Sequence, residues 1–160
     1  MMLALVAAAL LFVSAPDGDT MVVRDGNIKT VLRLAEVDAP ERTQPYSQVS
    51  RRNLIALCKD KPIEFQPVTL DRYGRTVAMV TCDGVLVNWR QVQDGLAWCF
   101  TKYLTQPAVC LPLEREARDA KRGVMSAPSA GRTDCESARE CGQPEQASDK
   151  HNVHLHARRL

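Results

Sequence analysis

The chain has almost no histidine outside its last ten residues, and this shortage limits the chemistry available to its main body. Only three of the 160 residues are histidine, namely His151, His154 and His156. Residues 1–150 therefore cannot contain a serine–histidine triad or a zinc site with a histidine ligand. Any catalysis in this part must rely on carboxylates, arginines, cysteines or a hard metal ion.

Several other signals are missing. The sequence has no Cys-x-x-Cys pair, no P-loop and no glycine-rich dinucleotide-binding motif. A net charge of +2 is too small to indicate a polyanion partner from bulk charge. With 45% hydrophobic and 25% charged residues, the composition excludes collagen-like, fully disordered and multi-span membrane chains. The length predicts one domain with its own core.

The first fifteen residues are apolar except for Ser14 and are too short to cross a membrane as a typical helix. Two interpretations remain open. The segment can be a secretory signal, although its start carries no Lys or Arg, or residues 10–15 can form a first strand that runs into the turn at 17–19. We favour the strand.

The remaining pattern alternates short strands with turns and ends in helices. Strands are predicted at residues 21–24, 28–37, 63–70 and 75–82. Helices are predicted at 47–58, with Ser47 as a possible cap, and at 87–94. A last helix is predicted with Pro112 in its first turn and Gly123 at its end. Residues 126–160 hold few large aliphatic side chains, so we expect a disordered polar tail, in which the histidines have little chance of forming a metal site.

This order of elements is typical of an OB-type barrel. We therefore expect an α+β, mainly β fold, with a five-stranded barrel and about three helices. Such barrels bind oligonucleotides or oligosaccharides on one face, which favours a polymeric ligand without identifying it.

Four segments resemble the signature segments of the staphylococcal nuclease (thermonuclease) family. They are Asp-Gly-Asp-Thr at 17–20, Arg-Leu-Ala-Glu-Val-Asp-Ala-Pro-Glu at 33–41, Asp-Arg-Tyr-Gly-Arg at 71–75 and Asp-Gly-Leu-Ala at 94–97. The resemblance covers residues 16–125 and implies a nuclease domain in that range. Each segment alone is weak, because Asp-Gly-Asp is a common turn, but together they are specific.

The resemblance implies a calcium site. Asp19 and Asp38 would bind Ca²⁺ through carboxylate oxygens, which are hard ligands suited to this ion, and the main-chain oxygen of Ala39 would join them. The family usually has threonine at this last position, and a main-chain ligand tolerates the change. Glu41 matches the general base that activates the attacking water.

The resemblance also implies how substrate is held. Arg33 and Arg75 match phosphate-binding residues, for which the planar donor fork of arginine is suited. Tyr73 and Tyr103 match positions where aromatic rings stack on the nucleotide. The implied substrates are DNA and RNA, preferably single-stranded, the implied products carry 3′-phosphates, and the protein is expected to be a monomer.

Each of these residues also has a simpler interpretation. Asp19 can belong to an ordinary turn, Arg33 can be a solvated residue on a strand, and Arg75 can pair with Asp71 across a turn. Their joint occurrence favours the enzyme. The alternative is a catalytically silent module of the same family that binds nucleic acid or a protein partner, although silent modules typically lose Arg33, Glu41 and Arg75.

Six cysteines suggest an exported protein, since disulfides persist in oxidising compartments. In a barrel of this kind the end of the first helix lies near the end of the strand after Gly74. We therefore favour a Cys58–Cys82 disulfide, with a pair of buried thiols as the alternative.

Overall fold

The computed structural model describes residues 10–126. The elements are β1 (Leu11–Ser14), β2 (Thr20–Asp25), β3 (Ile28–Leu34), β4 (Val37–Asp38), α1 (Ser47–Cys58), β5 (Ile63–Leu70), β6 (Thr76–Cys82), β7 (Val85–Leu86), α2 (Val87–Gln93), β8 (Trp98–Cys99), α3 (Pro107–Asp119) and the 3₁₀ helices η1 (Thr101–Tyr103) and η2 (Gly123–Ser126). This is the predicted α+β, mainly β fold. The predicted tail from residue 127 onward, with its histidines, and residues 1–9 lie outside the described residues.

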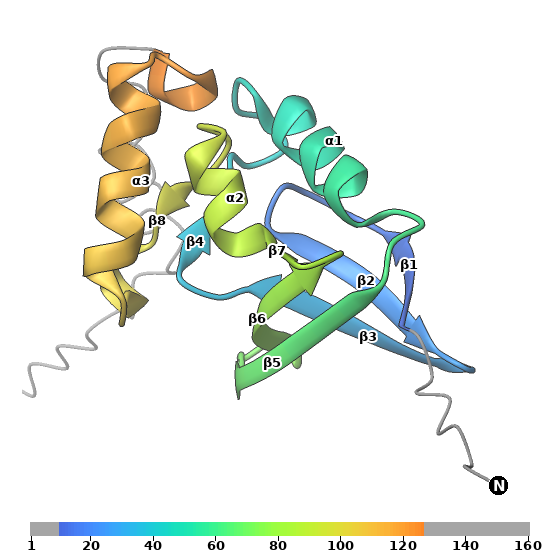
Figure 1. Cartoon of the computed structure of the whole chain (residues 1–160). Helices are drawn as coiled ribbons and strands as arrows, with labels where there is room; N and C mark the ends of the chain where they lie inside the picture. The colour runs from blue at the N-terminus through green and yellow to red at the C-terminus, as the bar shows by residue number, and fades with distance from the viewer. Residues whose placement is uncertain (1–9, 127–160) are drawn as a thin grey trace, which may run out of the picture. The chain divides into compact units, whose positions relative to one another are not determined.

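The main sheet has the strand order β1-β2-β3-β6-β5, with β7 paired to β6 (Figure 1). Neighbouring strands are antiparallel except β3 and β6, which are parallel. The favoured first strand is present as β1, and an isolated bridge between Leu10 and Ile63 joins the two edges of the sheet. Among the described residues, this single bridge connects the two edges of the sheet, and no continuous ladder of hydrogen bonds closes it into a barrel.

The core lies between the inner face of the sheet and the helices. Alternate residues of β2, β3 and β6 are fully buried, as the period of two in a strand requires. They pack with residues of α1 and α2, and the main members of this cluster are Met21, Val23, Leu32, Leu34, Leu54, Cys58, Ala78, Val80, Cys82, Val87 and Val92. In Figure 1, α2 lies between α1 and α3. Among the described residues, no helix combines the length and apolar character needed to cross a membrane.

The last helix begins earlier than predicted. Helix α3 starts at Pro107, and Pro112 lies inside it rather than in its first turn. The carboxylate of Glu36 accepts hydrogen bonds from the main-chain N–H groups of Thr105 and Gln106, just before the helix. These contacts from a residue distant in the sequence fix the chain where it enters α3 and place an acid near the N-terminus of the helix.

Two predicted boundaries also differ. The strand expected over 28–37 breaks at Glu36, which has a left-handed φ of 63°, so that Val37 and Asp38 form the separate strand β4. Ser47 does not cap α1. The N-cap residue is Tyr46, and the Ser47 hydroxyl instead donates to the main-chain oxygen of Arg42 at 3.1 Å.

Candidate active site

Arg33 lies at the centre of a group of buried polar atoms, and its side chain is only 12% exposed. Its Nη2 atom lies 3.1 Å from Oδ2 of Asp19 and 3.1 Å from Oδ1 of Asp38. Its Nη1 atom donates to the main-chain oxygens of Leu34 and Val37, at 2.8 and 2.9 Å. The structure thus brings three of the predicted site residues into direct contact, and Arg33 is not the solvated strand residue of the simpler interpretation.

Asp19 is buried and held on both carboxylate oxygens. Its Oδ2 atom accepts the main-chain N–H of Ala39 at 2.7 Å, and Oδ1 accepts the hydroxyl of Thr20 at 3.2 Å. Burial raises the pKa of Asp19 to about 7, and the Arg33 guanidinium opposes this rise without cancelling it, while neighbouring carboxylates add to it. The Arg33 guanidinium therefore offsets only part of the effect of burying the Asp19 carboxylate.

Close packing against α1 and α2 fixes the turn before Asp19. A Cβ atom at Gly18 would lie 1.8 Å from the Oγ atom of Ser50, so only glycine fits here. The Nε2 atom of Gln91 donates to the main-chain oxygens of Gly18, at 2.6 Å, and of Ser50, at 3.1 Å. Neither Ser50 nor Gln91 was among the residues predicted from the sequence, although a polar side chain on the inner face of each predicted helix was a signal that could have identified them.

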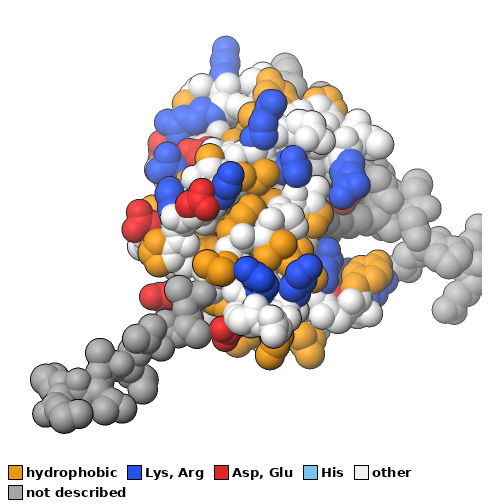
Figure 2. All heavy atoms as spheres, turned by 90° about the vertical axis from the view of Figure 1, so that its right-hand side faces the viewer, with side chains coloured by type: hydrophobic (Ala, Val, Ile, Leu, Met, Phe, Trp, Pro, Cys, Tyr) orange, Lys and Arg blue, Asp and Glu red, His pale blue; other side chains and the backbone are white. Residues whose placement is uncertain are grey.

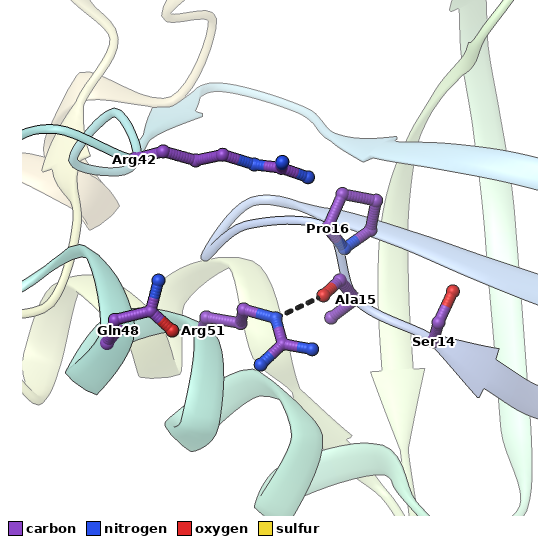
Figure 3. Close-up of a pocket in the computed structure, with 6 residues that line it drawn as sticks. All are labelled: Ser14, Ala15, Pro16, Arg42, Gln48 and Arg51. Carbon is purple, nitrogen blue, oxygen red and sulfur yellow. Dashed lines mark hydrogen bonds between the residues drawn. The ribbon is translucent and has the colours of Figure 1, made fainter.

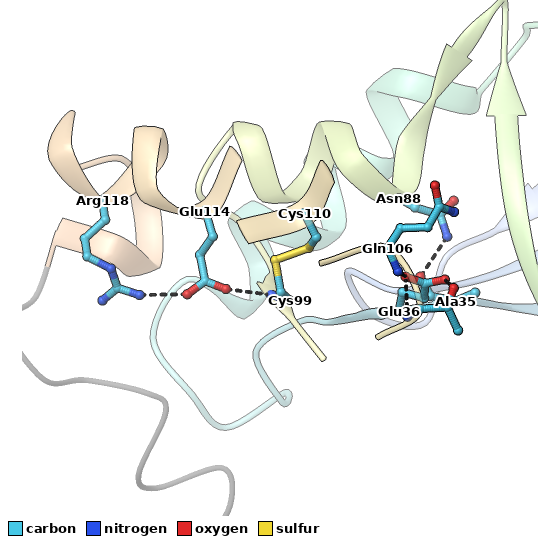
Figure 4. Close-up of a disulfide and its surroundings, with 9 residues drawn as sticks. Ala35, Glu36, Asn88, Cys99, Gln106, Cys110, Glu114 and Arg118 are labelled. Carbon is cyan, nitrogen blue, oxygen red and sulfur yellow. Dashed lines mark hydrogen bonds and ion pairs between the residues drawn. A yellow bond between two sulfur atoms is a disulfide. The ribbon is translucent and has the colours of Figure 1, made fainter. Parts of the chain in front are cut away.

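Asp38 is positioned from the opposite side by a short two-stranded sheet. Strand β4 pairs with β8, with Asp38 opposite Trp98 and Val37 opposite Cys99. A disulfide joins Cys99 to Cys110 in α3, and the carboxylate of Glu114 accepts the Cys99 N–H at 2.9 Å (Figure 4). Helix α3 therefore holds the strand against which Asp38 is paired. Sequence analysis did not predict this second disulfide, whereas the favoured Cys58–Cys82 pair is joined in the structure.

The parallel pairing of β3 and β6 places the second arginine on the same side of the sheet as the first. Arg33 is in register with Val77, and Arg75 precedes Val77 by two residues. Arg75 lies just before β6, and side chains two apart along an extended chain share a face, so Arg75 projects on the Arg33 side, about 7 Å earlier along the strand direction. The two predicted phosphate-binding residues thus share one face of the sheet.

Arg75 is held by the turn between β5 and β6. Its Nε atom donates to Asp71 at 2.7 Å, and the main-chain N–H groups of Tyr73 and Arg75 donate to the other carboxylate oxygen. Although burial opposes it, these hydrogen bonds lower the pKa of Asp71 from its usual value. Tyr73 is 67% exposed, and its ring centroid lies 5.4 Å from the Cζ atom of Arg75. The Nη atoms of Arg75 form no hydrogen bond with the described residues.

The structure leaves two predicted residues outside these contacts. Glu41 is exposed, and its main-chain N–H donates to the side chain of Gln44 at 2.8 Å, which forms the turn before α1. Tyr103 in η1 is 60% exposed and stacks edge to face on Phe100, with ring centroids 5.0 Å apart. No hydrogen bond or ion pair joins the Glu41 carboxylate to any described residue.

Two carboxylates, which are oxygen ligands of the kind that hard cations accept, lie close together at the site. Asp19 and Asp38 converge on one nitrogen atom of Arg33, and the Ala39 backbone lies against Asp19. Within residues 10–126, no group of three or more His, Cys, Asp or Glu side chains could hold a metal ion together. Oxygen ligands of mixed origin, two side chains and one carbonyl, are nevertheless what Ca²⁺ accepts.

Comparison with known proteins identifies the family. A family model described as staphylococcal nuclease homologue matches residues 31–127. The chain belongs to this family. It is 38% identical over 111 residues to an uncharacterized endonuclease of Escherichia coli O157:H7, which covers 69% of this chain and 72% of that protein. It is 31% identical over 151 residues to the micrococcal nuclease of Shigella flexneri, which covers 79% and 86% of the two chains.

A third relative, an uncharacterized endonuclease of Haemophilus influenzae, is 36% identical over 96 residues, covering 59% of this chain and 54% of that protein. Membership of the staphylococcal nuclease family and these nuclease relatives support a phosphodiester-hydrolysing nuclease. The family match spans Arg33, Asp38, Glu41 and Arg75 and begins after Asp19. Arg33, inside the matched range, contacts Asp19, which lies outside it.

Proposed function

We propose that this protein is a Ca²⁺-dependent nuclease that cleaves DNA and RNA and leaves 3′-phosphates. The observation that carries the proposal is the convergence of Asp19 and Asp38 on Arg33, with Arg75 on the same face of the neighbouring parallel strand. Hydrolysis of a phosphodiester needs positive charge around the phosphate oxygens and a positioned water. This face offers the arginines and the acids for both tasks.

In this proposal Asp19, Asp38 and the main-chain oxygen of Ala39 hold the calcium ion. Bound there, Ca²⁺ supplies charge that stabilises the negative charge developing on the phosphate in the transition state. The two buried carboxylates share one guanidinium as their counter-ion, and this arrangement supports a cation at this place.

The two arginines would act differently. The Nη atoms of Arg75 have no hydrogen-bond partner among the described residues, so they can donate directly to a phosphate oxygen. Arg33 uses both Nη atoms on protein oxygens. A cation held by Asp19 and Asp38 would share this role as counter-ion, and an edge of the Arg33 guanidinium would then be available to donate to the phosphate.

Glu41 is the proposed general base. Its carboxylate is exposed and has no protein partner among the described residues, so it is available to accept a proton from a water molecule beside the phosphate. Because Glu41 lies three residues after Asp38, the Cα atoms of the two residues are no more than about 11 Å apart.

Tyr73 and Tyr103 are proposed to stack on bases of the substrate. Both rings are mostly exposed, and stacking tolerates any base, which fits cleavage of DNA and RNA alike. Stacking also requires bases that are not already paired in a duplex, which supports a preference for single strands.

The test is cleavage of a single-stranded DNA oligonucleotide labelled at its 5′ end, with Ca²⁺ and with a chelator. We expect cleavage only with Ca²⁺, and fragments whose mobility shifts after treatment with a phosphatase that removes 3′-phosphates. Glu41→Gln keeps the shape of the side chain and removes its charge, so turnover should fall at least ~100-fold with unchanged thermal stability.

Two other results would reject parts of this proposal. Wild-type cleavage that persists in chelator would reject the role of calcium. A wild-type protein that binds the oligonucleotide and does not cleave it under any metal condition would support the silent binding module instead.

We further propose an exported monomer. Two disulfides within the described residues support an oxidising compartment. Fractionation of cells that produce the full chain, followed by size-exclusion chromatography of the recovered protein, tests both points.

A further inference from the structure

A second basic site lies beside the proposed catalytic cluster. A cavity of about 450 Å³ is lined by Ser14, Ala15, Pro16, Arg42, Gln48 and Arg51. Figure 3 shows the side chains of Arg42 and Arg51 extending from the loop before α1 and from α1 toward the segment that contains Ala15 and Pro16. Two of the lining side chains are cations and none is an acid. The cavity therefore suits an anion.

Neither arginine forms an ion pair with an acid among residues 10–126. Arg51 donates through Nε to the main-chain oxygen of Ala15 at 2.6 Å, and this bond aims the guanidinium into the cavity. Its Nη atoms have no partner among the described residues, and the guanidinium of Arg42 forms no hydrogen bond or ion pair with them. The nearest acid before the cavity, Asp17, turns its carboxylate to the N–H of Asp19.

The cavity adjoins both loops of the proposed catalytic site. Arg42 directly follows Glu41, and Pro16 lies three residues before Asp19. Because an extended chain spans at most about 3.6 Å per residue, the Cα atoms of Pro16 and Asp19 are no more than about 11 Å apart. A nucleic-acid strand carries one negative charge per nucleotide. A strand bound at the cluster therefore has further phosphates within reach of the cavity.

The surrounding surface favours a polyanion. On the face that lies to the right in Figure 1, blue basic side chains are more numerous than red acidic ones (Figure 2). Arg52 follows Arg51 on α1 and is exposed, but it does not line the cavity. It therefore offers a matched control with the same charge on the same helix.

We propose that the cavity formed by Arg42, Arg51 and the 14–16 segment binds a phosphodiester group of the substrate strand next to the one that is hydrolysed. This inference rests on the proposed nuclease function. The two guanidiniums supply donors for a phosphate oxygen and keep their charge at any working pH. The site would set the path of the strand and its affinity, and it would take no part in bond cleavage.

The experiment measures binding of a fluorescent single-stranded DNA of about twelve nucleotides in chelator, so that it does not depend on cleavage. Arg42→Gln and Arg51→Gln should each weaken binding at least ~5-fold, whereas Arg52→Gln should change it less than ~2-fold. Between about 50 and 200 mM salt, the double variant should lower the slope of log affinity against log salt by roughly 0.7 for each phosphate that the protein no longer binds. Arg51→Lys and thermal unfolding curves check that the weaker binding does not come from the missing Nε bond to Ala15.

Equal losses of affinity in all three Gln variants would show diffuse charge attraction and overturn the inference, and so would unchanged affinity in either cavity variant. The proposed function fails separately. If the wild type does not cleave the oligonucleotide with Ca²⁺ while the two cavity variants still weaken its binding selectively, the phosphate site stands and the catalytic proposal falls. If the wild type cleaves and neither cavity variant weakens binding selectively, the phosphate site falls and the catalytic proposal stands.

Discussion

The two arginines of the site stand in contrasting surroundings. Arg33 is buried between two carboxylates and two main-chain oxygens, whereas Arg75 lies at a turn, with one bond to Asp71 and an exposed tyrosine beside it. Elements β4, α1 and α2 position the groups around Arg33, whereas the four turn residues 71–74 position the groups around Arg75. Arg33 therefore contributes to the stability of the fold as well as to its chemistry, while Arg75 is available for chemistry at little cost to folding.

The sharpest test of this contrast is to remove each positive charge in turn. Arg33→Gln leaves Asp19 and Asp38 buried without their counter-ion and should lower the free energy of unfolding by about 3–5 kcal/mol. Arg75→Gln breaks only a partly exposed ion pair and should cost less than about 1 kcal/mol. Urea unfolding in the presence of chelator measures both. Equal losses would show that the burial of Arg33 has no energetic consequence.

Loss of the Cys99–Cys110 disulfide should disturb the buried surroundings of Arg33 more than the exposed turn that holds Arg75. Replacing both cysteines by serine should cost about 3 kcal/mol in the chain-entropy model. It should also lower turnover, because β8 loses its tie to α3 and Asp38 is paired with β8.

The matched control is the serine variant of Cys58 and Cys82, which join α1 to β6. It should lose comparable stability and keep its turnover, measured at a temperature where both variants remain folded. A similar turnover loss in both would mean that the second disulfide has no special role in placing Asp38.

A milder change separates charge from geometry at the exposed turn. Arg75→Lys keeps the positive charge and loses the planar fork, so the rate of cleavage should fall at least ~10-fold, about 1.4 kcal/mol, with no change in unfolding. Cleavage assays quenched at fixed times measure the rate, and thermal unfolding of the same preparation measures the stability. Near wild-type turnover would remove Arg75 from the phosphate contacts.

The smallest expected effect is a pH dependence at Asp71. Because its pKa is lowered in the folded protein, its contribution to stability is present above the ordinary aspartate pKa of about 3.9 and is lost as the pH falls through the lowered value. Asp71→Asn should therefore be less stable than the wild type at neutral pH, by under about 1 kcal/mol. The difference should vanish in acid, and a difference that persists there would point to lost hydrogen bonds rather than lost charge.

Sequence patterns predicted the elements whose signals are local. The ranges of α1 and β5 match the predicted 47–58 and 63–70, because hydrophobic spacing and flanking turns determine them. The start of α3 could not be predicted in this way, since Glu36, far away in the sequence, binds the two residues that precede the helix. A helix that tolerates Pro112 in its interior is a case where tertiary contacts outweigh local preference.

The same limit applies to the site. The motif segments identified Asp19, Arg33 and Asp38 as a group. Nothing local, however, indicated that Arg33 would contact both acids, because these contacts depend on the path of β4 after the left-handed Glu36. The supporting contacts of Gln91 and Ser50 likewise arise only when α1 and α2 pack on the turn at Gly18.

The parallel pairing of β3 with β6 has a consequence for folding kinetics. Strands β2 and β3 form a hairpin that can close early, but β3 meets β6 only after the intervening loop, α1 and β5 have been brought together. Closing such a long loop carries an entropic cost before any contact compensates for it, and topologies rich in distant pairings fold slowly. The face that carries both arginines is thus completed by one of the most non-local pairings of the sheet, and in a refolding time course cleavage activity should emerge with the final cooperative phase, after hairpin structure is already detectable.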